Sequence, residues 1–273
     1  MLTLVEVINS RSNTLSLPIA DSSSGYVVKS IEGLDPVKAA LTTSTLAGTD
    51  GAQAQNARRD TRNILIKLGL QPDYISTTVQ SLRSALYDWF LPKSNVGFKF
   101  YLDGVLHVTT SGQVETCGNS MFSQDPEVDI SVICYDPDFY APASEILTEN
   151  TVTDTSTVTV AYGGSSDAGV IFTLNIDRDL TGFTIYNTTP ENVVQKTDIV
   201  GTFVADDIVV INSVPGSKAI TLLRGSVSSS ILYYLDPSSD WVTLKKGSNE
   251  FRVYASGASM IYTLEYTPLY GAI

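Results

Sequence analysis

The sequence predicts a mainly β protein of two domains, an N-terminal α+β domain with one helix and a β-hairpin, followed by a C-terminal β-sandwich. Three observations predict this. Short segments alternate apolar and polar residues along most of the chain, one stretch has helical periodicity, and prolines interrupt regular structure near residue 140. With 273 residues, 43% of them hydrophobic, the chain can fill two cores.

The N-terminal domain contains several segments with the period of two that a half-buried strand requires. They are residues 5–8, 64–68, 98–102, 105–108 and 128–133. Asp103-Gly104 separates two of them, and Asp-Gly suits the positive φ angles of a type I′ turn, so residues 98–108 are predicted to form a hairpin. These strands predict a sandwich-like sheet in this domain.

One helix is expected, and it should end before Pro92, because the residue before a proline avoids the helical region. Thr77 and Gln80 have the spacing of a capping box at its start. Apolar residues recur at helical spacing, at Val79, Leu82, Leu86 and Trp89. We expect this stripe to pack on the sheet.

Residues 46–60 have little apolar content and predict a long loop, of the kind that is usually functional. Arg58, Arg59 and Arg62 follow as a basic run. Two interpretations stay open for this run: a solvated strand edge, or a contact surface for an acidic neighbouring subunit.

The domain boundary is expected within residues 136–144, where Asp136-Pro137-Asp138 and Pro142 break regular structure, giving domains 1–139 and 140–273. Beyond it, strands and turns alternate at the spacing of a β-sandwich, without a helical stripe. The residues 163–166 predict a hairpin turn. The expected strands are 157–160, 170–174, 183–186, 208–211, 231–234, 251–254 and 261–266.

Charge excludes several classes of partner. The formal net charge of −12 argues against phosphate contacts with nucleic acid and against docking on an anionic membrane. The first residues lack a basic segment followed by an apolar run, so no secretory signal is expected. Cys117 and Cys134 make neither a disulfide framework nor a zinc site, and free thiols in a reducing compartment are expected.

Catalytic chemistry is sparse. His107 is the single histidine and lies in the predicted hairpin, so an imidazole metal site is excluded by number and a catalytic triad has no recognisable context. Carboxylate pairs such as Asp206-Asp207 lie where turns are expected, although a glycosidase pair distant in the chain stays open. We therefore expect no enzyme activity, no cofactor and no metal.

Ordered segments along nearly the whole chain resemble the distal tail protein family of siphophages. The most specific are the helix ending in Leu91-Pro92-Lys93, the junction Cys134-Tyr135-Asp136-Pro137 and the segment from Trp241 to Ile273. Gly48-Thr49-Asp50-Gly51 leading to Arg59-Asp60-Thr61-Arg62 is similar to the family's loop-to-strand order. The candidate subunit-contact segment is therefore Gly48, Asp50, Gly51, Arg58, Arg59 and Arg62.

The resemblance implies an N-terminal ring-forming domain and a C-terminal galectin-like sandwich. It also implies a homohexameric ring at the virion tail tip, which meets the tail tube protein on one face and the tail hub or tail-associated lysin on the other. Peripheral receptor-binding proteins are further partners that the resemblance allows. No membrane partner is expected, and DNA only passes through the channel. Residues 1–139 carry 15 acidic and 10 basic side chains, so an acidic lumen that repels passing DNA is expected.

A binding module is the alternative function. Carbohydrate-binding sandwiches stack sugars on exposed aromatic side chains, and the second domain offers Tyr233, Tyr234, Trp241 and Tyr254. The same residues are commonly core and interface residues, and this interpretation is favoured. Receptor or saccharide binding by this domain therefore stands beside the structural role.

Overall fold

The computed structural model describes residues 1–22, 24–45, 47–48, 50–119 and 125–273, and the chain divides into two compact units. The first unit comprises Met1–Pro142 together with Tyr270–Ile273, and the second comprises Ala143–Leu269. The sequence-based boundary after residue 139 differs slightly from this division. Tyr140 pairs with Thr109, and the Ile273 amide donates to the Leu34 carbonyl, so both segments stay with the first unit.

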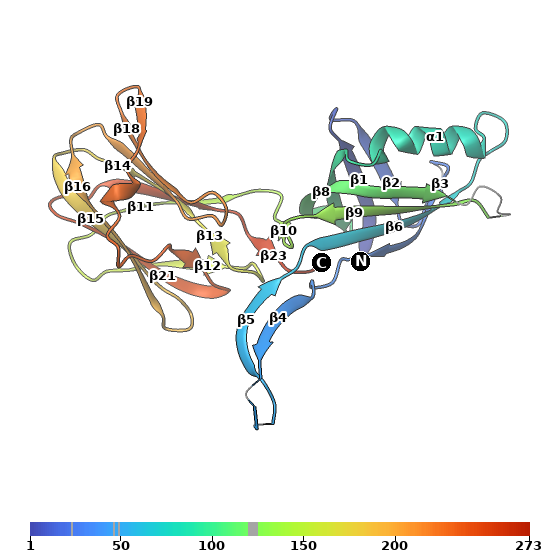
Figure 1. Ribbon diagram of the computed structural model, residues 1–273. Coiled ribbons are helices and arrows are strands. Elements are labelled where there is room, and N and C mark those ends of the chain that lie inside the picture. Colours follow the sequence, from blue (N-terminus) through green and yellow to red (C-terminus); the bar gives the residue numbers. More distant parts are fainter. Residues whose placement is uncertain (23, 46, 49, 120–124) are drawn as a thin grey trace. The chain divides into compact units, whose positions relative to one another are not determined.

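The first unit is built on one antiparallel sheet with the order β2-β1-β7-β8-β9-β6-β3 (Figure 1). Short strands β10 (Phe139–Tyr140) and β23 (Leu269–Tyr270) join it beside β8. The end strands β2 and β3 approach each other, so the sheet curls around its core. The main strands are β1 (Leu2–Asn9), β2 (Thr14–Pro18), β3 (Tyr26–Glu32), β6 (Arg62–Leu70), β7 (Asn95–Leu102), β8 (Val105–Asn119) and β9 (Glu127–Cys134).

Helix α1 (Val79–Phe90) packs on this sheet as the stripe predicts, and buries Leu82, Leu86 and Phe90. Its capping box lies one residue later than expected, at Thr78 and Ser81: Thr78 Oγ1 accepts from the Ser81 amide at 3.1 Å.

Thr77 is engaged elsewhere, because the loop before the helix is organised by Asp73. The Asp73 carboxylate accepts hydrogen bonds from the amides of Ile75, Ser76 and Thr77. These bonds, led by that from the Ser76 hydroxyl, hold the pKa of Asp73 well below its usual range. Because Thr77 is bonded to Asp73, Thr78 is the N-cap of the helix.

The second unit is a two-sheet sandwich. One sheet has the order β11-β22-β14-β17-β18-β19 and the other β12-β21-β15-β16, with β13 and β20 pairing separately. Aromatic rings pack in the core, with the Phe172 and Tyr262 centroids 5.2 Å apart. The strands are β11 (Glu145–Asn150), β12 (Val158–Tyr162), β13 (Ala168–Gly169), β14 (Ile171–Asn175), β15 (Leu180–Thr188), β16 (Val194–Phe203), β17 (Ile208–Asn212), β18 (Ala219–Arg224), β19 (Val227–Ser230), β20 (Thr243–Leu244), β21 (Gly247–Ala255) and β22 (Ile261–Tyr266).

Two local predictions for this unit are wrong. Residues 231–234 include a 3₁₀ helix, η1 (Leu232–Tyr234), and not a strand, because the Tyr234 ring packs on Gly201, which has no side chain to occupy that space. Residues 163–166 do not close a hairpin, since β12 pairs with β21 whereas β13 pairs with β20. In the residues that the structure describes, no helix is long and apolar enough to cross a membrane.

Candidate subunit-contact arm

A two-stranded arm leaves the first unit between β3 and β6. Strands β4 (Ala39–Ser44) and β5 (Gln53–Arg59) pair antiparallel, from Ala39 opposite Arg59 to Ser44 opposite Gln53. The prediction of a loop over residues 46–60 is therefore wrong for residues 53–59, while Leu46 lies outside the described residues. The sequence pattern fails because β5 has no buried face, and alternation marks a strand only when one face is buried.

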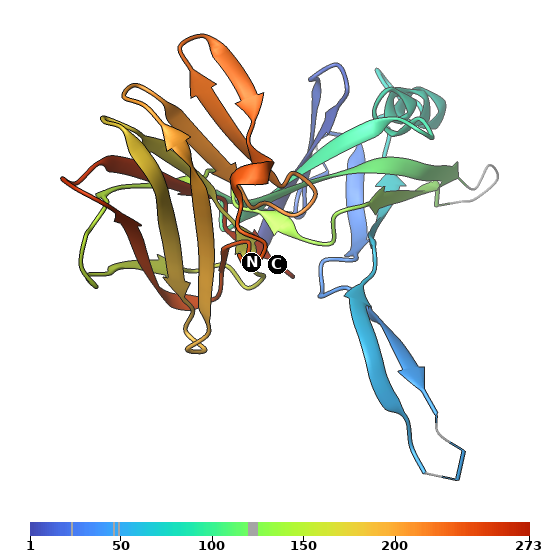
Figure 2. The same cartoon turned by 60° about the vertical axis from the view of Figure 1, so that its left-hand side comes forward.

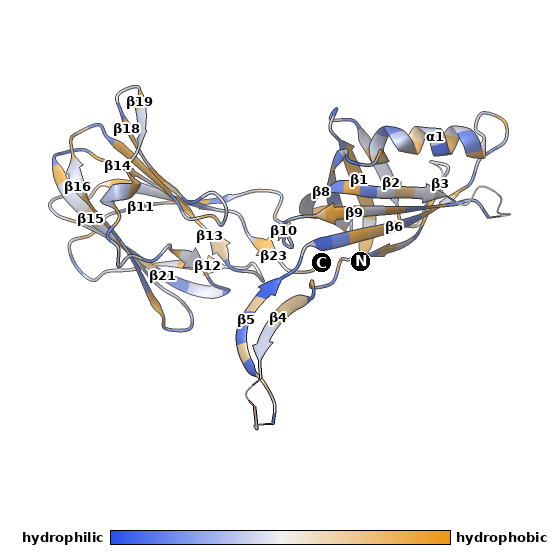
Figure 3. Cartoon of the chain, in the orientation of Figure 1, coloured by the Kyte–Doolittle hydropathy of each residue, from blue (hydrophilic) through white to orange (hydrophobic). Residues whose placement is uncertain are grey.

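The arm is exposed along most of its length, with only Ala40 and Ser44 of its two strands half-buried. Every residue of β5 is exposed, and Leu41 on β4 keeps 70% of its surface accessible. Figures 1 and 2 show the pair projecting from the sheet of the first unit, and Figure 3 shows that β5 is mainly hydrophilic. Its two strands pair only with each other among the strands that the structure describes.

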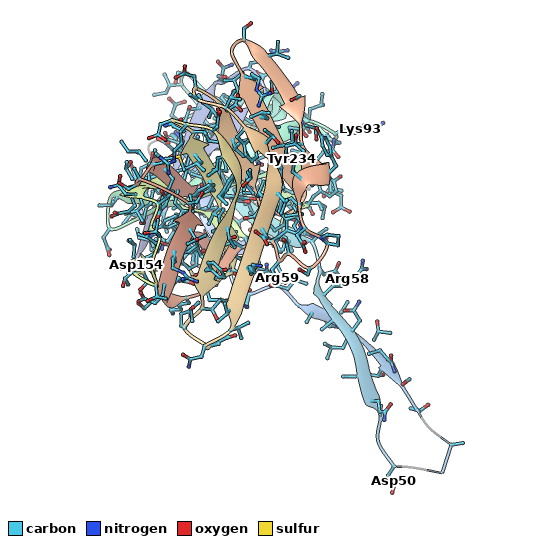
Figure 4. All side chains as sticks on the ribbon, turned by 90° about the vertical axis from the view of Figure 1, so that its left-hand side faces the viewer. Asp50, Arg58, Arg59, Lys93, Asp154 and Tyr234 are labelled. Carbon is cyan, nitrogen blue, oxygen red and sulfur yellow. The ribbon has the colours of Figure 1, made fainter. Side chains whose placement is uncertain are left out.

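The predicted contact residues lie at the two ends of this arm. Asp50 is at the tip, whereas Arg58 and Arg59 are at the root, as the labelled side chains in Figure 4 show, and Gly48 and Gly51 lie in the turn between the two strands. Gly48 and Gly51 have φ angles of +82° and +94°, which a residue with a Cβ adopts only with strain. The tip therefore needs its glycines for the reversal of the chain.

Arg59 anchors the root. Its guanidinium forms a two-pronged ion pair with the Asp138 carboxylate, with Nη2 to Oδ2 at 2.6 Å. The Asp138 side chain is 5% exposed, so the carboxylate needs this partner. Arg58, the neighbouring residue, is exposed and has no ion pair with any described residue. Adjacent arginines thus serve different purposes.

Arg62 is not at the surface. It is 1% exposed, and its guanidinium donates to main-chain carbonyls of its own chain while lying 4.1 Å from the centre of the Phe139 ring. Burial lowers the pKa of Arg62 below its ordinary value. Arg62 therefore acts from inside the root, and the exposed part of the candidate segment is reduced to the other five residues.

Other root and arm residues were not singled out by the sequence. Asp138 stands in the segment expected only to break regular structure at the domain boundary, and nothing in its spacing indicates Arg59 as a partner. Leu41 lies in a run of small and polar residues, and nothing in that run predicts that its side chain is exposed. A pocket of about 270 Å³ at the root is lined by Gly33, Asp35, Pro36, Val37, Lys38 and the four residues 60–63.

The aromatic residues considered for saccharide binding differ in their surroundings. Trp241 packs against the core of the second unit, with the Lys218 ammonium 5.4 Å from its ring centre. Tyr233 is 75% exposed and contacts the Tyr234 ring at 4.6 Å between centroids. Tyr254 is 41% exposed and lies on β21.

The remaining candidates have structural surroundings. The His107 ring packs 5.6 Å from the Tyr270 ring. Cys134 is buried and Cys117 half-buried, both as free thiols, and burial raises the pKa of Cys117 to about 11. Asp207 lies in the predicted turn but is buried and paired with Arg224 at 2.6 Å. Within the described residues, no group of three His, Cys, Asp or Glu side chains is arranged to hold a metal ion.

Comparison with known proteins identifies the architecture. The family model for the C-terminal domain of the siphovirus-type tail component matches residues 163–270. The crystal structure of Dit from phage SPP1, a hub adsorption apparatus protein in phages that infect Gram-positive bacteria, is similar over 97% of this chain and 98% of that one, with a TM-score of 0.68 and 17% identity. None of the curated proteins matches the sequence.

A chain of the phage P2 baseplate in its activated conformation with Ca has a TM-score of 0.46 and 9% identity, over 100% of both chains, which is too weak a likeness to support an argument. The family match covers most of the second unit, and the SPP1 protein has the fold of the whole chain. The mainly β, two-part fold expected from the sequence is confirmed. The chain therefore contains, at residues 163–270, the C-terminal domain of a siphovirus-type tail component, and as a whole it has the fold of SPP1 Dit.

Proposed function

We propose that six copies of this chain form a non-enzymatic ring at the tail tip. The ring joins the tail tube protein on one face to the tail hub or tail-associated lysin on the other, and peripheral receptor-binding proteins attach to its outside. The chain is made in the host cytoplasm and incorporated into the virion. The single observation that carries the proposal is the exposed arm of the first unit.

An isolated two-stranded hairpin is only marginally stable in water, and a sheet edge invites pairing with another chain. The arm stays paired from Ala39–Arg59 to Ser44–Gln53, with one register shift between Thr42 and Thr43, although β5 has no buried face. A ring supplies what is missing, because each arm then lies against the next copy and each copy receives one arm. The arm carries the exposed candidate contact residues Gly48, Asp50, Gly51, Arg58 and Arg59.

The charges of the arm suit a head-to-tail arrangement. Asp50 is exposed at the tip and Arg58 is exposed at the root, so the two ends have opposite sign. Opposite charges on the two ends of a contact surface favour one register over its reverse. The acidic excess of residues 1–139 supports a channel lined by carboxylates, along which DNA passes without adhering.

Mass and imaging of the purified full chain test the ring. Native mass spectrometry is expected to give six times the chain mass, and negative-stain images are expected to show rings with a central hole. A shortened arm, with residues 43–55 replaced by Asn-Gly so that the paired Thr42 and Asn56 flank a two-residue turn, is expected to leave a folded monomer. Monomers of the full chain, alone and with the tube protein, would contradict the ring; rings of the shortened chain would contradict the role of the arm.

Two matched substitutions localise the contact. Leu41 on the arm and Val227 on β19 of the second unit are 70% and 67% exposed. Leu41→Ser is expected to lower the fraction of chain in rings, whereas Val227→Ser is expected to leave it unchanged. Equal effects of the two substitutions would mean that the arm is not the contact.

Receptor or saccharide binding by the second unit is the second candidate. One observation favours it, the exposed Tyr233 ring held against Tyr234. Glycan-array binding by the full chain that is lost in Tyr233→Ser would support it. No binding by the full chain, on glycans or on host cells, would remove it.

A further inference from the structure

The arm has two roots, and both are held at one place in the first unit. Residues 33–38 lead from β3 into β4, and residues 59–62 lead from β5 into β6. The Asp60 amide donates to the Lys38 carbonyl at 3.1 Å, which joins the two roots directly. The direction of the arm therefore depends on what fixes these two short segments.

The buried guanidinium of Arg62 ties three separate segments together. Toward the first root, Nη1 donates to the carbonyls of Gly33 at 2.5 Å and Asp35 at 2.8 Å. Nε and Nη2 donate to the Pro137 carbonyl at 2.9 and 2.7 Å. Nη2 also donates to the Gly271 carbonyl at 2.6 Å. Pro137 lies where the chain is about to leave the first unit, and Gly271 lies just after the chain returns to it.

The returning segment Tyr270–Ile273 makes a second link to the same root. The Ile273 amide donates to the Leu34 carbonyl at 3.2 Å, and Tyr270 and Ile273 pack against the core of the first unit. Gly33 closes the arrangement at a φ of +86°, where a Cβ would lie 1.9 Å from the Asn63 carbonyl oxygen. The root of β4 is thus pressed against the start of β6.

Burying the Arg62 guanidinium to hold these segments costs desolvation free energy, so stability alone does not explain the choice of an arginine. All of its hydrogen bonds to described residues go to neutral carbonyls, and apolar side chains would avoid the cost of desolvating a charge. A planar guanidinium has donors pointing in several fixed directions, which no other side chain offers. The arrangement suits a residue whose task is to set geometry.

We propose that Arg62 and Tyr270–Ile273 form a clasp that sets the direction of the arm and couples it to the two connections of the second unit. The inference rests on the proposed ring function of the arm. Arg62 is then a positioning residue: it contacts no neighbouring copy, but a change at either connection reaches the arm through it.

The test measures opening of the roots separately from ring formation. Trypsin cleaves after Lys38 and Arg58 at the roots and after Lys99 on β7, which serves as an internal control site in the same unit. Both variants are made in the shortened-arm chain, which is expected to be monomeric. Ending that chain at Tyr270 removes the Gly271 carbonyl and the Ile273 amide. Arg62→Lys removes the planar fork. Each change is expected to speed cleavage at Lys38 and Arg58 by roughly tenfold, with cleavage at Lys99 unchanged.

Arg178→Lys is the matched control, because Arg178 also donates to carbonyls, those of Ser256 and Ala258, but in the second unit. It is expected to leave root cleavage unchanged. Unchanged cleavage in both clasp variants, or equal acceleration at Lys99, would overturn the inference; if Arg62→Lys fails to fold, the variant ending at Tyr270 decides.

The same two changes in the chain with its complete arm are expected to reduce the ring fraction. Rings formed by the shortened-arm chain would refute the proposed function of the arm, and the cleavage rates would still decide whether the clasp exists.

Discussion

Strands β5 and β6 are separated only by Asp60 and Thr61, yet they differ in the burial of their side chains and in the number of strands they pair with. Along β6, Ile64, Ile66 and Leu68 are buried, whereas every residue of β5 is exposed. Strand β6 has a partner on each side, β3 and β9, and β5 pairs with β4 alone. One strand is thus supported by its own core and the other is not.

This difference teaches where to look for a missing partner. A strand with an apolar face buries that face in its own domain, and its sequence alternates accordingly. A strand pair without such a face is only marginally stable alone, and its open edges can pair with another chain. The contrast between β5 and β6 therefore separates the part of the first unit that has its own core from the part that we propose for assembly.

The largest expected effect contrasts two apolar residues truncated to alanine. Ile66→Ala on β6 is expected to lower the free energy of unfolding by about 2–5 kcal/mol, because it opens a cavity in a closed core. Leu41→Ala on β4 is expected to change it by less than about 0.5 kcal/mol in the monomer. Urea unfolding of both variants measures the two losses, in the full-length chain at a concentration where it is monomeric.

A loss of stability at Leu41 comparable to that at Ile66 would show that the arm packs on its own chain. The contrast between β5 and β6 would then not hold, and there would be no reason to propose that the arm contacts a second copy of the chain. A small loss at Ile66 would show instead that the core of the first unit is loosely packed.

Much of the fold followed from pattern because burial and alternation go together. The strands around Ile66, Phe100 and Val132, the Asp103-Gly104 hairpin and the helix before Pro92 all have one apolar face or one specific turn residue. The 3₁₀ helix at residues 232–234 could not be predicted this way, since an Ile-Leu-Tyr-Tyr run suits a strand equally well. The Tyr234 ring packs on Gly201, a tertiary contact that no local pattern shows.

The candidate segment was only partly predictable. Gly48 and Gly51 marked a turn, and the arginine run marked a charged region, but no pattern showed that β4 and β5 pair. Nor could spacing distinguish Arg62, which is buried, from Arg58, which is exposed. Their difference arises from Pro137 and Gly271, which are distant in the sequence and adjacent only in the fold.

A smaller effect distinguishes two neighbouring arginines on the same strand. Arg59→Ala leaves the nearly buried Asp138 carboxylate without its guanidinium partner, and is expected to cost about 1–3 kcal/mol of unfolding free energy. Arg58→Ala is expected to cost less than about 0.5 kcal/mol in the monomer while reducing ring formation. Urea titration and native mass spectrometry measure the two quantities. Equal stability losses would mean that the root is held by the strand as a whole, and not by Arg59.

The smallest expected effect concerns pH and the exposed charges of the two strands. Glu127 forms ion pairs with Lys29 and with Lys67 of β6; the hydrogen bond from Lys29 is the main cause that lowers the pKa of Glu127, with Lys67 adding to it. Because the folded pKa lies below the unfolded value of about 4.3, the stabilisation is fully present above that pH. It is lost as the pH falls through the folded pKa.

Glu127→Gln is therefore expected to be less stable than the parent chain near neutral pH and equally stable in strong acid. Arg58→Gln on β5 removes a charge that has no ion-pair partner among the described residues, so its effect on the monomer is expected not to vary over the same acid range. Chemical denaturation of both variants across this range, at low and high salt, measures the difference, and salt should shrink the Glu127 effect. An acid-dependent effect at Arg58 as large as that at Glu127 would place a carboxylate of the same chain against the arm, and would mean that β5, like β6, is supported from within.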